Sequence, residues 1–341
     1  MKKKDIFLLF ILSGMAIVMI FFSSDMREGA YRGLALAENT IIPSLLPLLI
    51  IFLIIMKTGA RDVLAKMLGF MSVYLFNLPM VTFPAILMGL IGGYPTGALL
   101  TQELYKSNDI DKEQTKTMLR FNFCGGCGFI ITALGSARLM SIKAGLILFA
   151  SNAFAEIIIG ALCSLGRKRI KREFFSFNEN KSFSEALINA TEDAVKAVLN
   201  ITAFVILFSA VNNILKIPEY LLPLFEITTG VCGENSFSLP ELSAYLAFGG
   251  FCIHMQLLPI ILKCGMKYGD FLLSRTVSAL LSYCITKLIL IAMPIENQVF
   301  SNTSGSVGAF SSVNLALSAL LIAGCFVLVL DINSRKRAID N

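Results

Sequence analysis

Long apolar runs recur along this chain and constrain its fold more than any other feature. A helix needs about 20 apolar residues to cross the hydrocarbon core of a bilayer, and segment 142–165 reads IKAGLILFASNAFAEIIIGALCSL. Hydrophobic residues make up 56% of the 341 residues and charged residues only 15%, whereas an average soluble protein has roughly 25% charged residues. This composition excludes a soluble enzyme, a disordered protein and a disulfide-stapled secreted domain. The sequence predicts an all-α polytopic membrane protein.

About eight segments are predicted to cross the membrane, at roughly 5–24, 38–57, 122–140, 142–165, 198–216, 241–263, 270–293 and 311–330. The segments 80–105 and 218–240 are also apolar, but glycine, proline or polar residues interrupt them. Each is interpreted as a re-entrant hairpin that enters and leaves on the same side. The N-terminal apolar run is longer than the 7–15 residues of a signal peptide, which favours a retained first helix.

The distribution of lysine and arginine predicts the topology. With the N-terminus inside, 23 of these residues fall on the cytoplasmic side, 5 fall outside and Lys287 lies within a span. Cytoplasmic loops retain lysine and arginine, so both termini are predicted to be cytoplasmic, in the plasma membrane of a bacterium. The net charge of +6 therefore reflects topology, and no nucleic-acid partner is expected.

The order of these elements predicts two inverted-topology repeats. Residues 1–30 form an N-terminal transmembrane helix, 31–166 the first repeat, 167–197 a basic amphipathic cytoplasmic linker, 198–295 the second repeat, and 296–341 an exterior loop, a last helix and a basic tail. The stretch SFSEALINATEDAVKAVLN (182–200) is expected to lie along the cytoplasmic surface before the chain enters the membrane. FCGGCGFIITAL (123–134) weakly echoes FGGFCIHMQLLP (248–259). Inverted repeats with interrupted helices are typical of secondary transporters, which bind substrate at the breaks.

Four motifs resemble a known family. GLIGGYPTGA (89–98), NFCGGCGFI (122–130), FEITTG (225–230) and FGGFCIHMQ (248–256) resemble the YlbJ-type sporulation integral membrane proteins, within the wider nucleoside-recognition or Gate-domain group. The resemblance covers about residues 30–295. It implies a role in spore formation and in moving dipicolinate, a small planar dianion, toward the developing spore.

The first hairpin is broken at Gly92, Gly93, Tyr94, Pro95, Thr96 and Gly97. Proline suits the first turn of a new helix, and such a half-helix aims free N–H groups and a positive dipole end into the membrane interior. This arrangement favours a carboxylate site to which Thr96 adds a hydroxyl. The alternative is a packing site at which glycines let helices approach closely.

A partner break contains Asn122, Cys124, Gly125 and Gly126. Its small residues and the Asn122 amide are expected to line the solute site. The spacing of Cys124 and Cys127 also suggests a metal or redox motif. Zinc needs four ligands and the chain has one histidine, while redox CxxC motifs accompany a βαβ pattern that is absent from the sequence. No metal and no cofactor are predicted.

The second hairpin has its tip at Glu226, Thr228, Thr229 and Gly230. A carboxylate at membrane depth is costly and is by default a functional hypothesis. Glu226 could accept a proton, bind a coupling cation or receive a hydrogen bond from the solute. The alternative is a loop glutamate at the outer interface.

A further candidate region follows Gly249 and Gly250 and contains His254 and Gln256. Histidine can titrate near physiological pH, so a protonated His254 would attract an anion. The alternative is a structural histidine whose hydrogen bonds are satisfied. Gln256 is two residues further on and faces away from His254 unless the helix is interrupted.

Each repeat has one charged residue deep in its last helix, Glu156 in the first repeat and Lys287 in the second. They are expected either to pair with each other or to serve proton or ion coupling along a transport path. Arg275 is interpreted as an anchor on the cytoplasmic side.

These features favour a secondary-type transporter of a small polar or anionic metabolite, possible substrates being dipicolinate, a nucleoside or a related solute. The alternative is a non-transporting membrane scaffold needed for spore maturation. No enzyme is predicted, because the sequence contains no HExxH or GxSxG motif and no pair of catalytic aspartates. The expected partners are the solute and the lipid bilayer, and a homo-oligomer is a further alternative.

Overall fold

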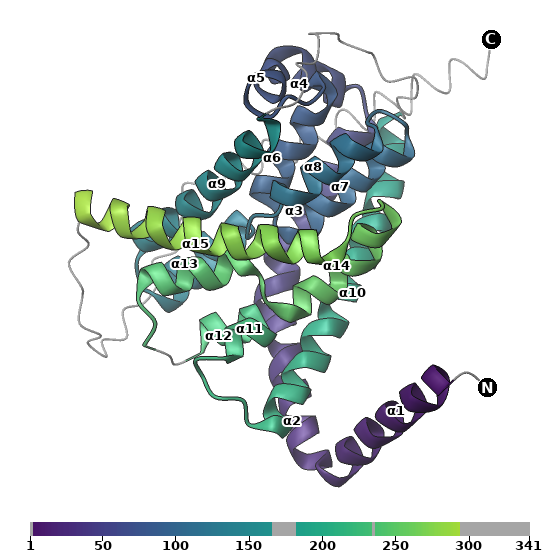
Figure 1. The fold of residues 1–341 in the computed structure, drawn as a ribbon, viewed down its shortest axis with the longest axis vertical. Coiled ribbons are helices and arrows are strands. Elements are labelled where there is room, and N and C mark those ends of the chain that lie inside the picture. The colour runs from purple at the N-terminus through teal and green to yellow at the C-terminus, as the bar shows by residue number, and fades with distance from the viewer. Residues whose placement is uncertain (1–2, 166–181, 234–235, 294–341) are drawn as a thin grey trace.

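The computed structural model describes residues 3–165, 182–233 and 236–293, and its regular elements there are all helices (Figure 1). The predicted crossing 311–330, the segment 296–341 and most of the linker 167–197 lie outside the described residues. Within them, the all-α prediction is confirmed.

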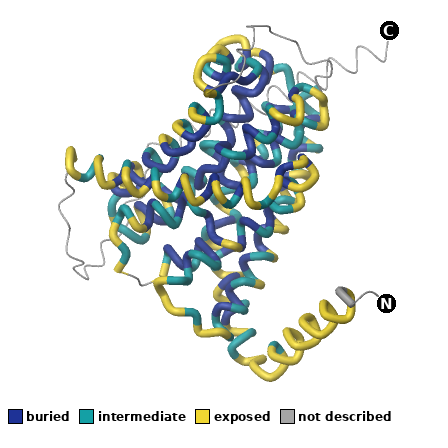
Figure 2. Tube along the Cα trace, viewed as in Figure 1, coloured by how far each residue is buried: buried dark blue, intermediate teal, exposed yellow. Residues whose placement is uncertain are grey.

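The N-terminal third begins with a helix that stands apart from the rest of the chain. This helix, α1 (Lys3–Phe21), is exposed along nearly all of its length (Figure 2). It is followed by α2 (Ser23–Leu36), the π-helical segment η1 (Ala37–Ile41) and α3 (Ile42–Lys57). The last three form one continuous helical segment, Ser23–Lys57, that is long and apolar enough to cross a membrane, so this segment is longer than the predicted 38–57.

The next elements, which complete the first predicted repeat, are short helices and one long one. In order they are α4 (Ala60–Leu68), α5 (Phe70–Phe76), the 3₁₀ turn η2 (Met80–Thr82), α6 (Phe83–Gly92), α7 (Tyr94–Lys106), α8 (Lys112–Phe121), the π-helical η3 (Gly128–Arg138) and α9 (Ile142–Ser164). The predicted hairpin 80–105 is seen as α6 and α7, which break at Gly93 and pack against each other.

The second predicted repeat contains six helices, two of which are very short. They are α10 (Phe183–Leu215), α11 (Leu222–Phe225), α12 (Ile227–Cys232), α13 (Leu239–Phe248), α14 (Gly250–Lys263) and α15 (Tyr268–Ala292). The predicted hairpin 218–240 corresponds to α11 and α12, and the predicted crossing 241–263 is interrupted at Gly249.

Among the described residues, five helical segments are long and apolar enough to cross a membrane, or six if α5 and η2–α6, bent by 100°, count as one span. The predicted count of eight is therefore not reached there. Segment 122–140 is not among these candidate spans, because it starts with non-helical backbone and continues as η3. The apolar part of α1, Asp5–Phe21, is shorter than a full span.

The segment 182–200, expected along the membrane surface, is continuous with the crossing that follows it in the part of the chain that the structure describes. Residues 183–215 form one unbroken helix, α10. Ala186, Ala190, Ala194 and Val198 recur every four residues and are buried, so one stripe of small side chains packs this region against the other helices.

Contacts at the two ends of the molecule match the predicted grouping of the loops. Lys57 pairs with Asp193 at 3.0 Å and with Glu103 at 3.7 Å, which joins segments predicted to be cytoplasmic. At the other end, the Asn213 amide donates to the Asp25 carbonyl at 2.7 Å, which joins segments predicted to be exterior. The assignment of these ends to the cytoplasm and the exterior stays a prediction of the charge rule.

Candidate functional site

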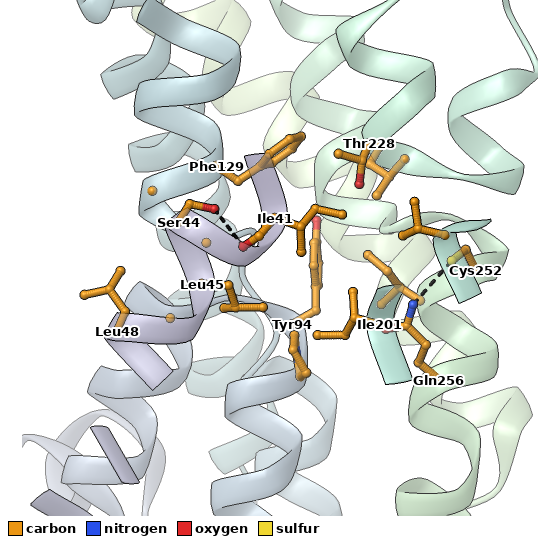
Figure 3. A pocket seen from close by; sticks show the side chains of 18 of the residues that line it. Ile41, Ser44, Leu45, Leu48, Tyr94, Phe129, Ile201, Thr228, Cys252 and Gln256 are labelled. Atoms are coloured by element: carbon orange, nitrogen blue, oxygen red, sulfur yellow. Dashed lines mark hydrogen bonds between the residues drawn. The ribbon is translucent and has the colours of Figure 1, made fainter. Parts of the chain in front are cut away.

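The helix breaks of both predicted repeats surround one cavity, here called the central cavity, which contains about 700 Å³ of empty space, part of it open to solvent (Figure 3). Its walls come from the start of α3, the α6–α7 break, the residues before η3, the middle of α10, the start of α12 and α14. Eight residues of the predicted site line it: Gly92, Gly93, Tyr94, Pro95, Gly126, Glu226, Thr228 and Gln256. The sequence therefore identified the breaks that meet here.

The α6–α7 break is shaped by two glycines in close contact. Gly93 has a φ of +103°, a conformation that favours glycine, and Pro95 then stands in the first turn of α7. A Cβ added at Gly93 would lie 3.2 Å from the backbone nitrogen of Gly126. The two breaks thus cross backbone to backbone, and a larger side chain at either position would push them apart.

Tyr94 stands in the middle of the central cavity (Figure 3). Its ring lies beside Gly249 and its hydroxyl beside Gly125, since a Cβ added at either glycine would be 3.4 Å from the tyrosine. The residue is 7% exposed, and its hydroxyl has no hydrogen-bond partner among the described residues. A buried polar group without a partner is costly, so this hydroxyl is suited to bind a group that enters the cavity.

Glu226 is the one acidic side chain among the residues that line the central cavity. It is 1% exposed and caps the short helix α12: its carboxylate accepts hydrogen bonds from the backbone N–H of Thr228 at 2.9 Å and of Thr229 at 2.6 Å, and from the Thr229 hydroxyl. The same carboxylate thus positions the α12 break and faces the cavity. The side chain is buried at the start of α12 and is not exposed in a loop.

Asn122 does not line the central cavity. Its amide nitrogen donates to the carbonyls of Ala85 at 3.1 Å and Gly97 at 3.3 Å, so it lies between α6 and α7. A Cβ added at Gly97 would lie 1.8 Å from the Asn122 carbonyl oxygen. At Gly97 the packing alternative therefore holds. Thr96 is fully buried outside the lining as well.

His254 also lies away from the central cavity. It is fully buried; one ring nitrogen, Nε2, lies 3.0 Å from the Phe248 carbonyl, and Nδ1 lies 3.1 Å from the Tyr268 hydroxyl. Nε2 must donate to the carbonyl, so Nδ1 accepts from the tyrosine in a neutral ring. These contacts fit the alternative of a structural histidine whose hydrogen bonds are satisfied. His254 satisfies a carbonyl that the break at Gly249 leaves free, while Gln256, as predicted, faces elsewhere and lines the cavity.

The remaining predicted site residues shape the breaks without lining the cavity: Cys124, Gly125, Thr229, Gly230, Gly249 and Gly250. Gly230 packs against Pro223, because an added Cβ would lie 2.4 Å from that ring. Cys124 and Cys127 are free thiols, and the described residues contain no group of three or more His, Cys, Asp or Glu side chains that could hold a metal.

The predicted pair of Glu156 with Lys287 is wrong. Lys287 is exposed on α15, whereas Glu156 binds Arg275 through two hydrogen bonds of 2.9 Å. Arg275 is 1% exposed, so it is not an anchor on the cytoplasmic side. It also donates to the carbonyls of Arg120 at 2.7 Å and Phe123 at 3.0 Å, which the end of α8 leaves free. This pair therefore supports the break before η3.

Sequence reasoning missed part of the cavity wall. Ser44 and Leu45 at the start of α3 and Ile201 and Val205 on α10 all line the cavity. A serine beside Pro43 within an apolar run was the available signal for the first pair. Nothing in the pattern around Ile201 distinguishes a cavity wall from ordinary helix packing.

One comparison links the chain to a described protein. It is 23% identical over 299 residues, 73% of each chain, to the sporulation integral membrane protein YlbJ of Bacillus subtilis (strain 168). No family profile and no solved structure matches this chain. The similarity supports the YlbJ-type family of sporulation integral membrane proteins that the motifs indicated, while the wider Gate-domain grouping stays a prediction.

Proposed function

We propose that this chain is a secondary-type transporter that carries a small polar or anionic solute through the central cavity by alternating access. The observation that carries the proposal is the meeting of the helix breaks around one cavity, which contains a tyrosine hydroxyl without a hydrogen-bond partner in the described part of the chain. Interrupted helices inside a membrane protein are tolerated where they are buried in protein or line a cavity, and transporters bind their substrates at such breaks.

Several contacts between helices support an arrangement in two related repeats. If α3, α7, α8, η3 and α9 correspond to α10, α12, α13, α14 and α15, a two-fold relation predicts that a contact made by one set recurs in the other. The contacts α7–α14 and α12–η3 form such a pair, as do α8–α15 and α13–α9, and α3–η3 and α10–α14. The equivalent helices α3 and α10, and α9 and α15, also contact each other. Rocking of one repeat against the other about the central cavity is the motion that this arrangement favours.

The walls of the central cavity suit a small solute with an apolar face and a few polar groups. Ile41, Leu45, Ile201 and Ile253 supply apolar surface, and the Tyr94 hydroxyl is available for a hydrogen bond. Dipicolinate, which the family resemblance implies, has a flat ring and carboxylates, and it is the first solute to test. A nucleoside is the second.

Glu226 is the candidate for coupling transport to a cation. No lysine, arginine or histidine is among the residues that line the central cavity, so an anionic solute would meet a buried carboxylate without a compensating charge. A proton or a metal cation taken up by Glu226 would remove this repulsion. The Glu156–Arg275 pair is better suited to a structural role, because each partner already neutralises the other.

The experiment is uptake by the purified protein in liposomes, with labelled dipicolinate and a labelled nucleoside compared side by side. Tyr94→Phe removes only the hydroxyl that faces the cavity, and one hydrogen bond is worth about 1 kcal/mol, which corresponds to a roughly fivefold rise in KM. Tyr105→Phe is the matched control, since Tyr105 lies on the same helix and does not line the cavity.

Saturable dipicolinate uptake whose KM rises in Tyr94→Phe and not in Tyr105→Phe would support the proposal in full. Uptake of the nucleoside alone would keep the transporter and discard the dianion. No uptake of either solute by folded protein would favour the scaffold alternative.

A further inference from the structure

A second hollow opens beside the central cavity. This hollow, here called the vestibule, contains about 1130 Å³ of empty space, part of it open to solvent. It lies between the η1–α3 region and η3, at the end of the molecule that the charge pattern assigns to the exterior. Its lining includes the polar side chains Asn39, Thr40, Ser44 and Thr132.

This polar lining contrasts with the exposed sides of the long helices. The residues exposed there include Phe154 on α9, Leu199 on α10 and Leu280 on α15, as expected of surfaces that face lipid. Ser44 and Thr132 donate to carbonyls of their own helices, and each hydroxyl oxygen keeps acceptor capacity for water. Polar groups at membrane depth are placed where they face protein or a water-filled cavity.

The vestibule leads into the central cavity. Ser44 lines both hollows. On η3, Gly128 and Phe129 line the central cavity, whereas Thr132 further along the same element lines the vestibule. The two flanking segments, η1 and η3, are both π-helical, a rare conformation that is frequent at functional sites. The two hollows therefore adjoin at Ser44 and follow the same pair of elements.

The opposite end of the central cavity is filled by apolar side chains. Beyond Leu48, which lines the cavity, α3 buries Leu49, Leu53 and Met56 in one cluster. The same cluster contains Leu100 and Leu104 of α7 and Ala194 and Val198 of α10. These three helices all contribute to the wall of the central cavity, so the cluster closes the space between them.

An ion-pair network follows this cluster at the end of α3. The Lys57 ammonium lies 3.0 Å from the carboxylate of Asp193 on α10 and 3.7 Å from that of Glu103 on α7. The Lys57 side chain is only 11% exposed. One lysine thus ties together the three helices that the apolar cluster joins, at the end predicted to be cytoplasmic.

We propose that the vestibule is the water-filled entrance through which a polar solute reaches the central cavity, and that Lys57, with Asp193 and Glu103, is the gate that keeps the opposite end closed. The described conformation is accordingly the outward-facing state. Release toward the cytoplasm requires Lys57 to part from both carboxylates and the apolar cluster to open. This inference rests on the proposed transport function, and it names the two ends of the path without depending on the identity of the solute.

Single cysteines introduced into the full chain test the entrance. Ser44→Cys places a thiol where the two hollows meet, and Thr132→Cys places one in the vestibule. Leu199→Cys is the matched control: Leu199 is 60% exposed and lies two residues before the cavity-lining Ile201, so it is on the outer side of α10 at a similar depth. Intact cells are treated with a charged, membrane-impermeant methanethiosulfonate, and mass spectrometry of each peptide separates the introduced thiol from the native cysteines.

Ser44→Cys and Thr132→Cys are expected to be modified from outside the cell. Leu199→Cys is expected to stay unmodified, because neither a charged reagent nor a thiolate enters hydrocarbon. Absence of modification at both Ser44→Cys and Thr132→Cys would mean that lipid or protein fills the vestibule, and it would overturn the entrance. Modification of Ser44→Cys in inside-out vesicles alone would overturn the assignment of the outward-facing state.

Lys57→Gln tests the gate in the Ser44→Cys protein. The ratio of the modification rates measured from the exterior and from the cytoplasmic side should fall by about fivefold, the effect of losing one ion pair at the upper end of the range for exposed pairs. Asp193→Asn should shift the ratio in the same direction, and the charge swap Lys57→Asp with Asp193→Lys should restore most of it. An unchanged ratio in both Lys57→Gln and Asp193→Asn would overturn the gate.

Lys196→Gln is the control for the gate. It removes an exposed basic residue of α10 that pairs with Glu192 on the same helix at 3.8 Å, and it should leave the ratio unchanged. Uptake in liposomes separates this inference from the transport function. Labelling as expected without uptake of any solute would reject the transporter and keep the entrance and the gate, whereas uptake with labelling from the cytoplasmic side alone would keep the transporter and reject this inference.

Discussion

Arg275 on α15 and Glu156 on α9 form a two-pronged ion pair in which both side chains are 1% exposed. Ser278 adds a hydrogen bond to the carboxylate, and the guanidinium also binds two carbonyls at the end of α8. Three helices and one helix break are therefore joined at a single charged cluster. Removing one partner would leave the other charge buried and uncompensated.

Glu156→Gln is expected to destabilise the protein by about 3–5 kcal/mol, because breaking a buried pair leaves an unpaired charge. The measurement is the midpoint of thermal unfolding of the purified protein in detergent. Lys287→Gln is the matched control, since Lys287 is exposed on the same helix as Arg275, and it should leave the midpoint unchanged. Equal midpoints for the two variants would show that the pair contributes nothing to stability.

Gly97→Ala should destabilise the contact between the first hairpin and the break before η3. An added Cβ would lie 1.8 Å from the Asn122 carbonyl oxygen, and forcing extra atoms into a packed site costs about 1–3 kcal/mol. Gly269→Ala provides the control, because nothing lies within 4 Å of a Cβ added there. Thermal unfolding in detergent distinguishes the two, and equal stability would mean that α7 can move away from Asn122 at little cost.

The breaks were predictable because their cause is local. Gly93 and Pro95 dictate a change of backbone direction whatever surrounds them, and the acidic Glu226 followed by two threonines indicates a helix start. From such signals the sequence identified the residues at which both predicted hairpins are broken and most of the polar groups in the central cavity.

The pairing of charges was not predictable, because it depends on how helices pack. Glu156 and Lys287 occupy similar places in their helices, yet the rotation of α15 turns Arg275 inward and leaves Lys287 exposed. Spacing alone does not say which side of α15 faces the protein; here it is the side that carries Ser274, Ser278, Ser282 and Thr286, and apolar residues are exposed on the other side. The same limit applies to Asn122, whose polar side chain was expected in the solute site and instead joins α6 to α7.

His254→Phe should lower stability and leave the pH dependence of uptake unchanged. The ring nitrogens bind the Phe248 carbonyl and the Tyr268 hydroxyl, and a buried group left without its partner costs about 1–3 kcal/mol. The measurement is the pH profile of solute uptake between about pH 5 and 8, the range in which histidine titrates.

Gln256→Leu is the matched comparison for His254→Phe. It alters a residue that lines the central cavity and should change KM while retaining stability. A pH profile that flattens in His254→Phe would contradict the structural role of the histidine.

Glu226→Gln tests the coupling of transport to a cation. Glutamine retains one acceptor oxygen for the N–H groups at the start of α12, so the loss of capping should cost only about 1 kcal/mol. The variant cannot take up a proton or bind a metal cation as a carboxylate does, so a proton or sodium gradient imposed across liposomes should no longer accelerate uptake, while exchange of solute without a gradient persists. Glu219→Gln alters an exposed carboxylate seven residues earlier and should keep the response. If Glu226→Gln responds to a gradient as strongly as the unmodified chain, Glu226 serves only to cap α12, and the coupling group lies elsewhere.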